Sequence, residues 1–112
     1  MAKQILKNTA NELAVKIVSA NSETITLADG DYSGVAPSGY SILSIRWTIA
    51  DGYIAIERGS DSLYELSGNG HWNLTGLADY KNSTDTIDIV YYGGETTGLE
   101  VYTLIIHLSK IS

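Results

Sequence analysis

Residues 41–59, SILSIRWTIADGYIAIERG, decide the fold class of this chain. Apolar and polar residues alternate on both sides of Asp51-Gly52, which is the period of a β-strand with one buried face. An Asp-Gly pair suits the two-residue turn of a β-hairpin, because both central residues of that turn need a positive φ angle. The stretch therefore predicts two antiparallel strands joined at Asp51-Gly52.

The register of this predicted hairpin places apolar residues opposite each other on one face and opposite charges opposite each other on the other face. If Asp51-Gly52 is the turn, Trp47 lies opposite Ile56 on an apolar face, and Arg46 lies opposite Glu57 on the other face. Trp47 is therefore predicted to be a core residue, and Arg46 and Glu57 are predicted to form a cross-strand ion pair.

Other short segments with the same alternation follow one another along the 112 residues. They are separated by turn signals at intervals of roughly ten residues, which is typical of a β-sandwich or a small barrel. We therefore expect a single all-β, antiparallel domain of about seven to eight strands over residues 1–112. Besides the hairpin, the expected strands are residues 12–19, 22–28, 62–67, 71–74, 86–92 and 99–111, and residues 3–8 are either an edge strand or an arm that reaches a partner.

The sequence also predicts the conformation of the connections between these segments. Residues 20–22 are predicted to close a tight hairpin, residues 68–70 to turn the chain, and residues 75–83 to be irregular with one helical turn. Residues 99–111 are apolar on both faces, which predicts a central strand or a face that a neighbouring subunit covers.

Composition restricts the classes of partner. Seven Lys and Arg against thirteen Asp and Glu give a net charge of −6, which argues against nucleic acid or an anionic membrane as partner. Charged residues make up 18% of the chain, below the usual ~25%, so part of the surface is neutral, as protein-contact surfaces are. There is no cysteine. The first residues lack the apolar core of a signal peptide, so we expect a protein kept in a cytoplasm or exported without a cleaved signal.

Each candidate catalytic or metal site fails at a specific residue. The run Asp29-Gly-Asp-Tyr-Ser-Gly34 resembles the first half of a calcium loop, but Tyr40 stands where the bidentate Glu belongs, and Pro37 occupies the part that should enter a helix. His71 and His107 lie on separate elements with no carboxylate at ligand spacing. No serine lies in a nucleophile-elbow sequence. We therefore expect no enzymatic activity, no metal and no cofactor.

The aromatic residues outside the predicted core are candidates for a surface patch. Trp72, Tyr53, Tyr91 and Tyr92 have small polar neighbours, and such aromatics serve protein contacts and carbohydrate binding alike. The N-terminal segment and the loops at residues 29–39, 68–72 and 93–98 are the expected places for function. The candidate partner-contact residues are Ile5, Leu6, Asp31, Tyr32, Trp72 and Tyr92.

Three regions of the chain resemble small virion proteins of tailed bacteriophages, especially phages of aquatic bacteria. They are AKQILKNTANELAVKI at residues 2–17, RW at 46–47 with IAIER at 54–58 and LYELSGNGHW at 63–72, and TIDIVYYGG at 86–94 with YTLIIHLSK at 102–110. The resemblance covers nearly the whole chain and lies in its pattern, without a diagnostic motif. It implies a β-sandwich present in many copies on a capsid or tail, with no catalytic residues.

The resemblance favours a capsid decoration or cement protein. Such a protein is expected to bind the major capsid protein or another virion protein, as a homo-oligomer, in virions assembled in the host cytoplasm. Two alternative hypotheses stay open. One is a tail, neck or fibre-associated adaptor, and the other is a carbohydrate-binding module that uses Trp72 and tyrosines.

Overall fold

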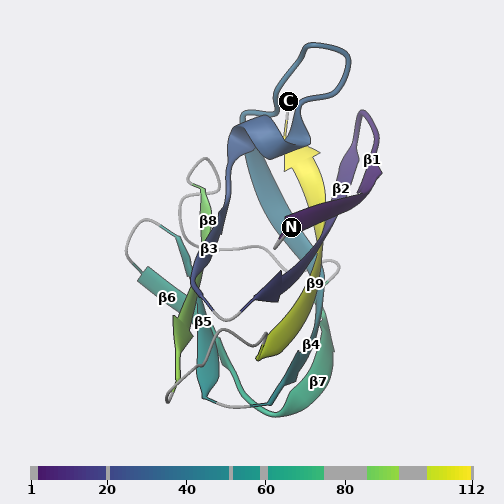
Figure 1. The fold of residues 1–112 in the computed structure, drawn as a ribbon. Helices are drawn as coiled ribbons and strands as arrows, with labels where there is room; N and C mark the ends of the chain where they lie inside the picture. Colours follow the sequence, from purple (N-terminus) through teal and green to yellow (C-terminus); the bar gives the residue numbers. More distant parts are fainter. Residues whose placement is uncertain are drawn as a thin grey trace.

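The computed structural model describes residues 3–19, 21–50, 52–58, 61–74, 86–93 and 101–111. These residues form nine strands and one 3-10 helix, η1 (Figure 1). The expectations for residues 75–83 and for most of the 93–98 loop fall outside the described residues. No helix in the described ranges is long and apolar enough to cross a membrane. In chain order the elements are β1 (Lys3–Asn8), β2 (Glu12–Ser19), β3 (Glu23–Ile25), η1 (Leu27–Gly30), β4 (Gly39–Ile49), β5 (Tyr53–Arg58), β6 (Asp61–Leu66), β7 (Asn69–Asn73), β8 (Ile87–Tyr92) and β9 (Tyr102–Ile111).

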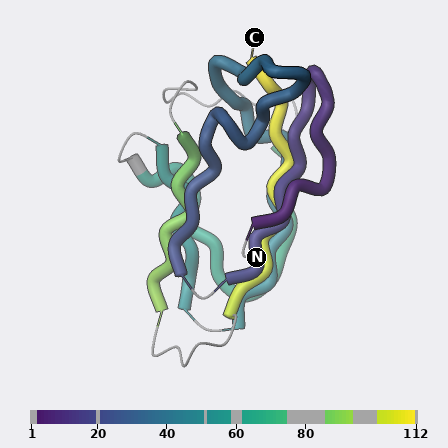
Figure 2. Tube along the Cα trace, turned by 45° about the horizontal axis from the view of Figure 1, so that its top comes forward, coloured from purple at the N-terminus to yellow at the C-terminus, as the bar shows by residue number. Residues whose placement is uncertain are grey.

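The strands form two antiparallel sheets packed face to face (Figure 2). Sheet A has five strands in the order β1-β2-β9-β4-β7, and sheet B has four in the order β3-β8-β5-β6. The predicted fold class, a small antiparallel β-sandwich, is confirmed, with nine described strands against the seven or eight expected. Strand β9 lies in the centre of sheet A, as its apolar residues on both faces predicted.

The core lies between the sheets and follows the alternation of the strands. On β2 and β9 every second side chain is buried, and β9 contributes Leu104, Ile106 and Leu108, none of which has any exposed surface. Sheet B contributes Ile54 and Ile56 in the same way. The other fully buried aliphatic residues are Leu13, Val15, Ile17, Ile25, Ile45, Ile87 and Ile89.

The predicted central hairpin is wrong. Strands β4 and β5, which should pair with each other, lie in different sheets. Trp47 lies opposite Gly70 of β7 and Leu104 of β9, whereas Ile56 lies opposite Ile89 of β8. The connection through Gly52, which has a φ of +78°, carries the chain from sheet A to sheet B. The predicted pair of Arg46 and Glu57 is wrong for the same reason.

The physical cause is that a crossing between packed sheets leaves the same pattern in the sequence as a hairpin. In both arrangements the apolar positions of the two strands face one core, so burial was predicted correctly at Trp47 and Ile56 although pairing was not. The same error affects the predicted hairpin at residues 20–22, because β2 and β3 are in different sheets. Residues 68–70 also join a strand of one sheet to a strand of the other. Consecutive strands pair directly at β1–β2 and β5–β6.

Two buried tyrosines of sheet A hold both ends of the short strand β3 of sheet B. The Tyr102 hydroxyl donates to the carbonyl oxygen of Asn21, before β3, at 2.6 Å. The Tyr40 hydroxyl donates to the carbonyl oxygen of Thr26, after β3, at 2.8 Å. Because β3 has only three residues, these bonds fix a strand that its own pairing with β8 would hold weakly.

This arrangement predicts that alkaline pH destabilises the fold. Burial raises the pKa of both Tyr40 and Tyr102 to about 12, from an ordinary value of 10. The unfolded chain releases these protons more easily, so the free energy of unfolding keeps its full value below pH 10 and falls as the pH rises from 10 to 12. Urea denaturation at steps of pH should show a midpoint that falls over this range.

The control is the double variant Tyr40→Phe with Tyr102→Phe, which removes both ionisations. We expect it to be less stable at pH 8, because two carbonyl groups lose their donors, and to have a much flatter dependence on pH between 10 and 12. Tyr32→Phe, at an exposed position, should keep the wild-type dependence. An unchanged slope in the double variant would contradict the assignment.

Candidate protein-contact surface

Strand β1 presents two apolar side chains at a free edge of sheet A. Ile5 and Leu6 have 42% and 48% of their surface exposed. The register with β2 shifts between Ile5 and Lys7, which places Leu6 at an irregularity in the ladder. Such an irregularity disturbs the row of backbone groups that another strand would need for pairing. This edge therefore offers side chains, more than backbone, to a partner.

The loop at residues 31–38 contains a two-residue turn between Tyr32 and Val35. Tyr32 and Val35 exchange two backbone hydrogen bonds of 2.9 and 3.1 Å. The residues between them, Ser33 and Gly34, have φ angles of +54° and +81°. Positive φ at both central residues is the feature that suits a two-residue hairpin turn. The turn leaves Val35 70% exposed, more than any other large apolar side chain in the described ranges.

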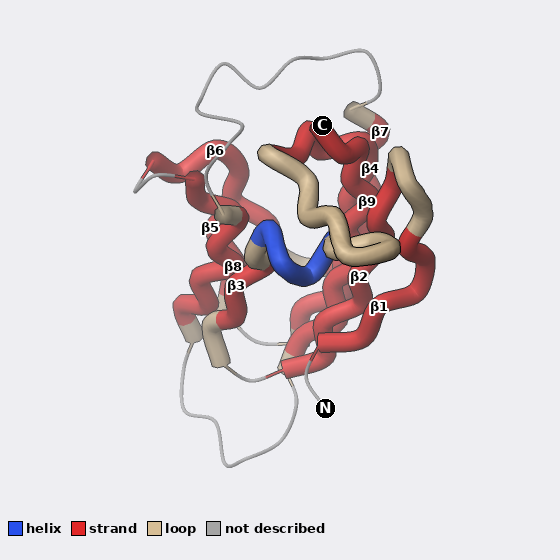
Figure 3. The backbone as a smooth tube through the Cα atoms, turned by 90° about the horizontal axis from the view of Figure 1, so that it is seen from above, coloured by secondary structure: helices blue, strands red, loops and turns tan. Residues whose placement is uncertain are grey.

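The base of this loop is anchored by η1. The Thr26 hydroxyl accepts from the backbone nitrogen of Asp29, and the Asp29 carboxylate accepts from the backbone nitrogen of Thr26, which is a capping box. The same carboxylate accepts from Lys3 Nζ of β1 at 2.7 Å. Seen from above, η1 and the loop lie over the end of the sandwich, between the two sheets (Figure 3).

The loop is held beside the end of β1 that leads into β2. The side-chain amide of Asn8 donates to the carbonyl oxygen of Asp31 at 2.9 Å. Lys110 Nζ donates to Asn8 Oδ1 and to the carbonyl oxygen of Thr9, and it lies 5.5 Å from the centre of the Tyr32 ring. Desolvation lowers the pKa of Lys110. We call the surface formed by Ile5, Leu6, Asp31, Tyr32 and Val35 the edge surface.

A mainly apolar cavity of about 300 Å³ lies beneath the turn. Its walls come from the loop, from the β1–β2 turn and from the end of β9, and they consist of Ala10, Tyr32, Ser33, Val35, Ala36, Pro37, Lys110 and Ile111. Because Tyr32 and Val35 line the cavity and are also exposed, an apolar side chain of a partner would contact the same residues that form the edge surface.

The structure places Trp72 away from the edge surface. Trp72 is on β7, and its ring makes edge-to-face contacts with Trp47 at 5.5 Å and with Tyr64 of β6 at 5.3 Å. It therefore bridges the open side of the sandwich, where the last strands of the two sheets meet. Trp72 keeps 40% of its surface exposed. With two aromatic rings packed against it, Trp72 covers the gap between the edge strands of the two sheets, and we call it a sealing residue for that reason. Its ring is less available for stacking on a sugar than a ring without such contacts.

Tyr92 also lies elsewhere, on the outer face of sheet B. Its ring is stacked on that of Tyr53, with 5.0 Å between the ring centres, and both are exposed. The negative charge of Glu57 is the main cause that raises the pKa of Tyr92. The candidate residues are thus divided among three places: Ile5, Leu6, Asp31 and Tyr32 on the edge surface, Trp72 at the open side, and Tyr92 on sheet B.

The groups considered as metal ligands have other contacts. The Asp29 carboxylate caps η1 and pairs with Lys3, as described above. Nε2 of His107 lies 3.0 Å from Glu12 Oε1, and the same oxygen is 2.7 Å from Lys7 Nζ, all on the outer face of sheet A. Lys7 and His107 lower the pKa of Glu12, Lys7 more strongly. In the described part of the chain no three His, Asp or Glu side chains are grouped so that they could hold a metal ion.

Sequence reasoning missed Val35, which belongs to the edge surface, and Lys110, which contacts Asn8 and Tyr32 beside it. Val35 is an apolar residue directly after Ser33-Gly34, and a Ser-Gly pair is typical of a turn. Its position at a surface turn could therefore have been predicted from the sequence. Lys110 had no comparable signal, because its place depends on the pairing of β9 with β4, which brings the end of β9 beside the loop.

Comparisons with known proteins do not assign this chain to a family. No protein-family model matches this chain, and no curated protein matches it. Among solved structures, a coat protein dimer of Tobacco streak virus is similar at 15% sequence identity and a TM-score of 0.38, over 96% of this chain and 90% of that chain. A score of this size says nothing about what this chain binds.

Proposed function

We propose that this chain is a non-enzymatic structural protein of a virion, and specifically a capsid decoration or cement protein. It binds the major capsid protein or another virion protein through the edge surface. The main observation in support of a contact role is that exposed apolar side chains are grouped on this surface. Of the seven large apolar side chains that are exposed in the described ranges, Ile5, Leu6, Tyr32 and Val35 belong to this one surface.

The anchoring of these side chains supports the proposal. Exposed apolar groups that gather at one place mark protein interaction sites. Here they sit on a strand of sheet A and on a turn held by η1, Asn8 and Lys110, so little conformational entropy is lost when a partner binds. The virion itself enters the proposal from the resemblance to small phage virion proteins.

The experiment is to measure the copy number of the chain in purified particles of a phage that encodes it. Quantitative mass spectrometry against the major capsid protein should give hundreds of copies per particle for a decoration protein. A few copies or about a dozen would replace this role by that of a tail, neck or fibre-associated adaptor. Absence of the chain from particles would overturn the virion role.

A variant then tests the edge surface. Particles that lack the chain are incubated with purified wild-type protein or with the double variant Leu6→Ser, Val35→Ser, and bound protein is measured after sedimentation. Both side chains are exposed, so the fold should be retained, while the loss of apolar contact should weaken binding at least about tenfold.

A matched control keeps this test specific. Tyr53→Ser removes an exposed large side chain from sheet B, away from the edge surface, and it should leave particle binding unchanged. Point variants are better than deletion of residues 1–8, because β1 pairs with β2 and Lys3 holds Asp29. Wild-type binding by the double variant would remove the edge surface from the proposal.

A further inference from the structure

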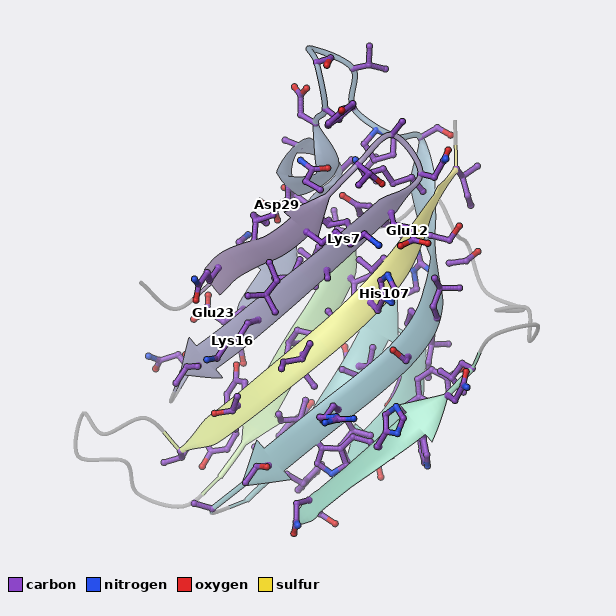
Figure 4. The ribbon with its side chains drawn as sticks, turned by 90° about the vertical axis from the view of Figure 1, so that its right-hand side faces the viewer. Lys7, Glu12, Lys16, Glu23, Asp29 and His107 are labelled. Carbon is purple, nitrogen blue, oxygen red and sulfur yellow. The ribbon has the colours of Figure 1, made fainter. Side chains whose placement is uncertain are left out.

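The outer face of sheet A carries two cations, Lys16 and Arg46, that have no acidic partner among the described residues. Lys16 of β2 and Arg46 of β4 are the two neighbours of Ile105 of β9, so one row across the sheet reads cation, apolar, cation. In the described ranges no acidic side chain lies within ion-pair distance of either cation. The carboxylate on this face, Glu12, is engaged by Lys7 and His107 (Figure 4).

The outer face of sheet B carries the opposite charge. Glu57 of β5 and Asp88 of β8 lie directly opposite each other, an arrangement of like charges that destabilises a sheet. Glu65 of β6 points to the same side, since it is opposite Ala55, and its charge and that of Glu57 both raise the pKa of Tyr92. At the outward positions of the described part of sheet B there is no Lys or Arg.

The charged side chains of the two faces have a comparable spacing. Lys16 and Arg46 share one row on strands separated by one strand, so they lie about 10 Å apart across sheet A. Asp88 and Glu65 are also on strands separated by one strand, but Glu65 is opposite Ala55 and Asp88 is opposite Glu57, so this pair runs diagonally across sheet B and is somewhat longer. The stacked rings of Tyr53 and Tyr92 lie beside these carboxylates and offer an aromatic surface to a guanidinium group. A surface that presents both carboxylates and aromatic rings suits an arginine-bearing face.

We propose that the outer face of sheet A of one copy docks on the outer face of sheet B of a second copy. Charge complementarity selects this pairing, because docking two identical faces would bring like charges together. Since every copy keeps one free face of each kind, the contact is head-to-tail and continues into a ring or a filament. It leaves the edge surface free, so it does not depend on the proposed virion contact.

The test measures association of purified protein by sedimentation velocity. Wild-type protein should associate with increasing concentration at an ionic strength of about 0.01 M and dissociate at higher salt, where charges are screened. The variant Lys16→Gln, Arg46→Gln removes the cations of one face, and Glu57→Gln, Asp88→Asn removes two carboxylates of the other. Each variant alone should associate at least about tenfold more weakly than wild type.

A mixture of the two variants distinguishes head-to-tail docking from other contacts. Each variant retains one intact face, complementary to the intact face of the other, so an equimolar mixture should form a heterodimer that grows no further. Asp31→Asn, a neutralised acid on the edge surface, should associate as wild type does. Wild-type protein that stays monomeric at low salt would overturn the proposal, and so would variants that fail to combine.

Discussion

Trp47→Ala should lower the free energy of unfolding by about 3–5 kcal/mol, the range for removal of a large buried aromatic side chain. Trp47 is only 8% exposed and packs against Trp72. A Cβ added to Gly70 would lie 2.7 Å from the indole, which shows how closely the ring covers that glycine. The variant also leaves the Ser67 carbonyl oxygen without the indole N–H donor, which is now 2.9 Å away. Urea denaturation followed by circular dichroism measures the loss.

Trp72→Ala is the matched comparison. It removes the same side chain from the other half of the aromatic contact, but 40% of Trp72 is already exposed. Since less apolar surface returns to water, the loss should stay below about 2 kcal/mol. Equal losses in the two variants would mean that Trp72 belongs to the core as fully as Trp47 does, and would contradict the description of it as a sealing residue.

Gly52→Ala should destabilise the fold through two separate effects. The φ of +78° costs a side-chain-bearing residue about 1–2 kcal/mol. The added Cβ would also collide with the backbone, namely the Tyr92 carbonyl oxygen and Gly93 Cα, the latter at 2.6 Å. Overpacking of this kind costs a further amount of about 1–3 kcal/mol. Thermal and urea denaturation should both show the loss.

Gly68→Ala separates these two effects. Gly68 also has a positive φ, of +62°, but nothing lies within 4 Å of an added Cβ. This variant should therefore show only the conformational cost. If Gly52→Ala destabilised the fold no more than Gly68→Ala does, the close approach of the β4–β5 connection to the end of β8 would be refuted.

The alternation of apolar residues was enough to predict the fold class and the buried face of most strands. It did not predict which strands pair, because the apolar positions of Trp47 and Ile56 face the same core whether the chain folds back in one sheet or crosses to the other. Turn chemistry did not decide either, since Gly52 needs a positive φ in both cases. Pairing in this fold depends on contacts between residues far apart in the sequence, such as Leu13 opposite Leu108.

The exposure of some candidate contact residues was predictable from the sequence, and their role as contacts stays a prediction. Ile5 and Leu6 stand between lysines near the start of the chain and Tyr32 stands in a glycine-rich loop, and all three are exposed in the fold. The contacts of Trp72 with Trp47 and Tyr64 could not be predicted from the local sequence, because they require β7 and β6 to be edge strands of two different sheets. The opposite charges of the two outer faces have the same origin, since they emerge only once each strand is assigned to its sheet.

The position of β9 has a consequence for how the protein is made. β9 is the last described strand in the chain, yet it is the centre of sheet A and pairs with both β2 and β4. During synthesis, β2 and β4 therefore leave the ribosome before their common neighbour exists, with apolar residues such as Leu13 and Ile45 exposed. Sheet A closes only when Tyr102–Ile111 has emerged, so we expect its folding to be slow, as it is for other folds built on distant pairings.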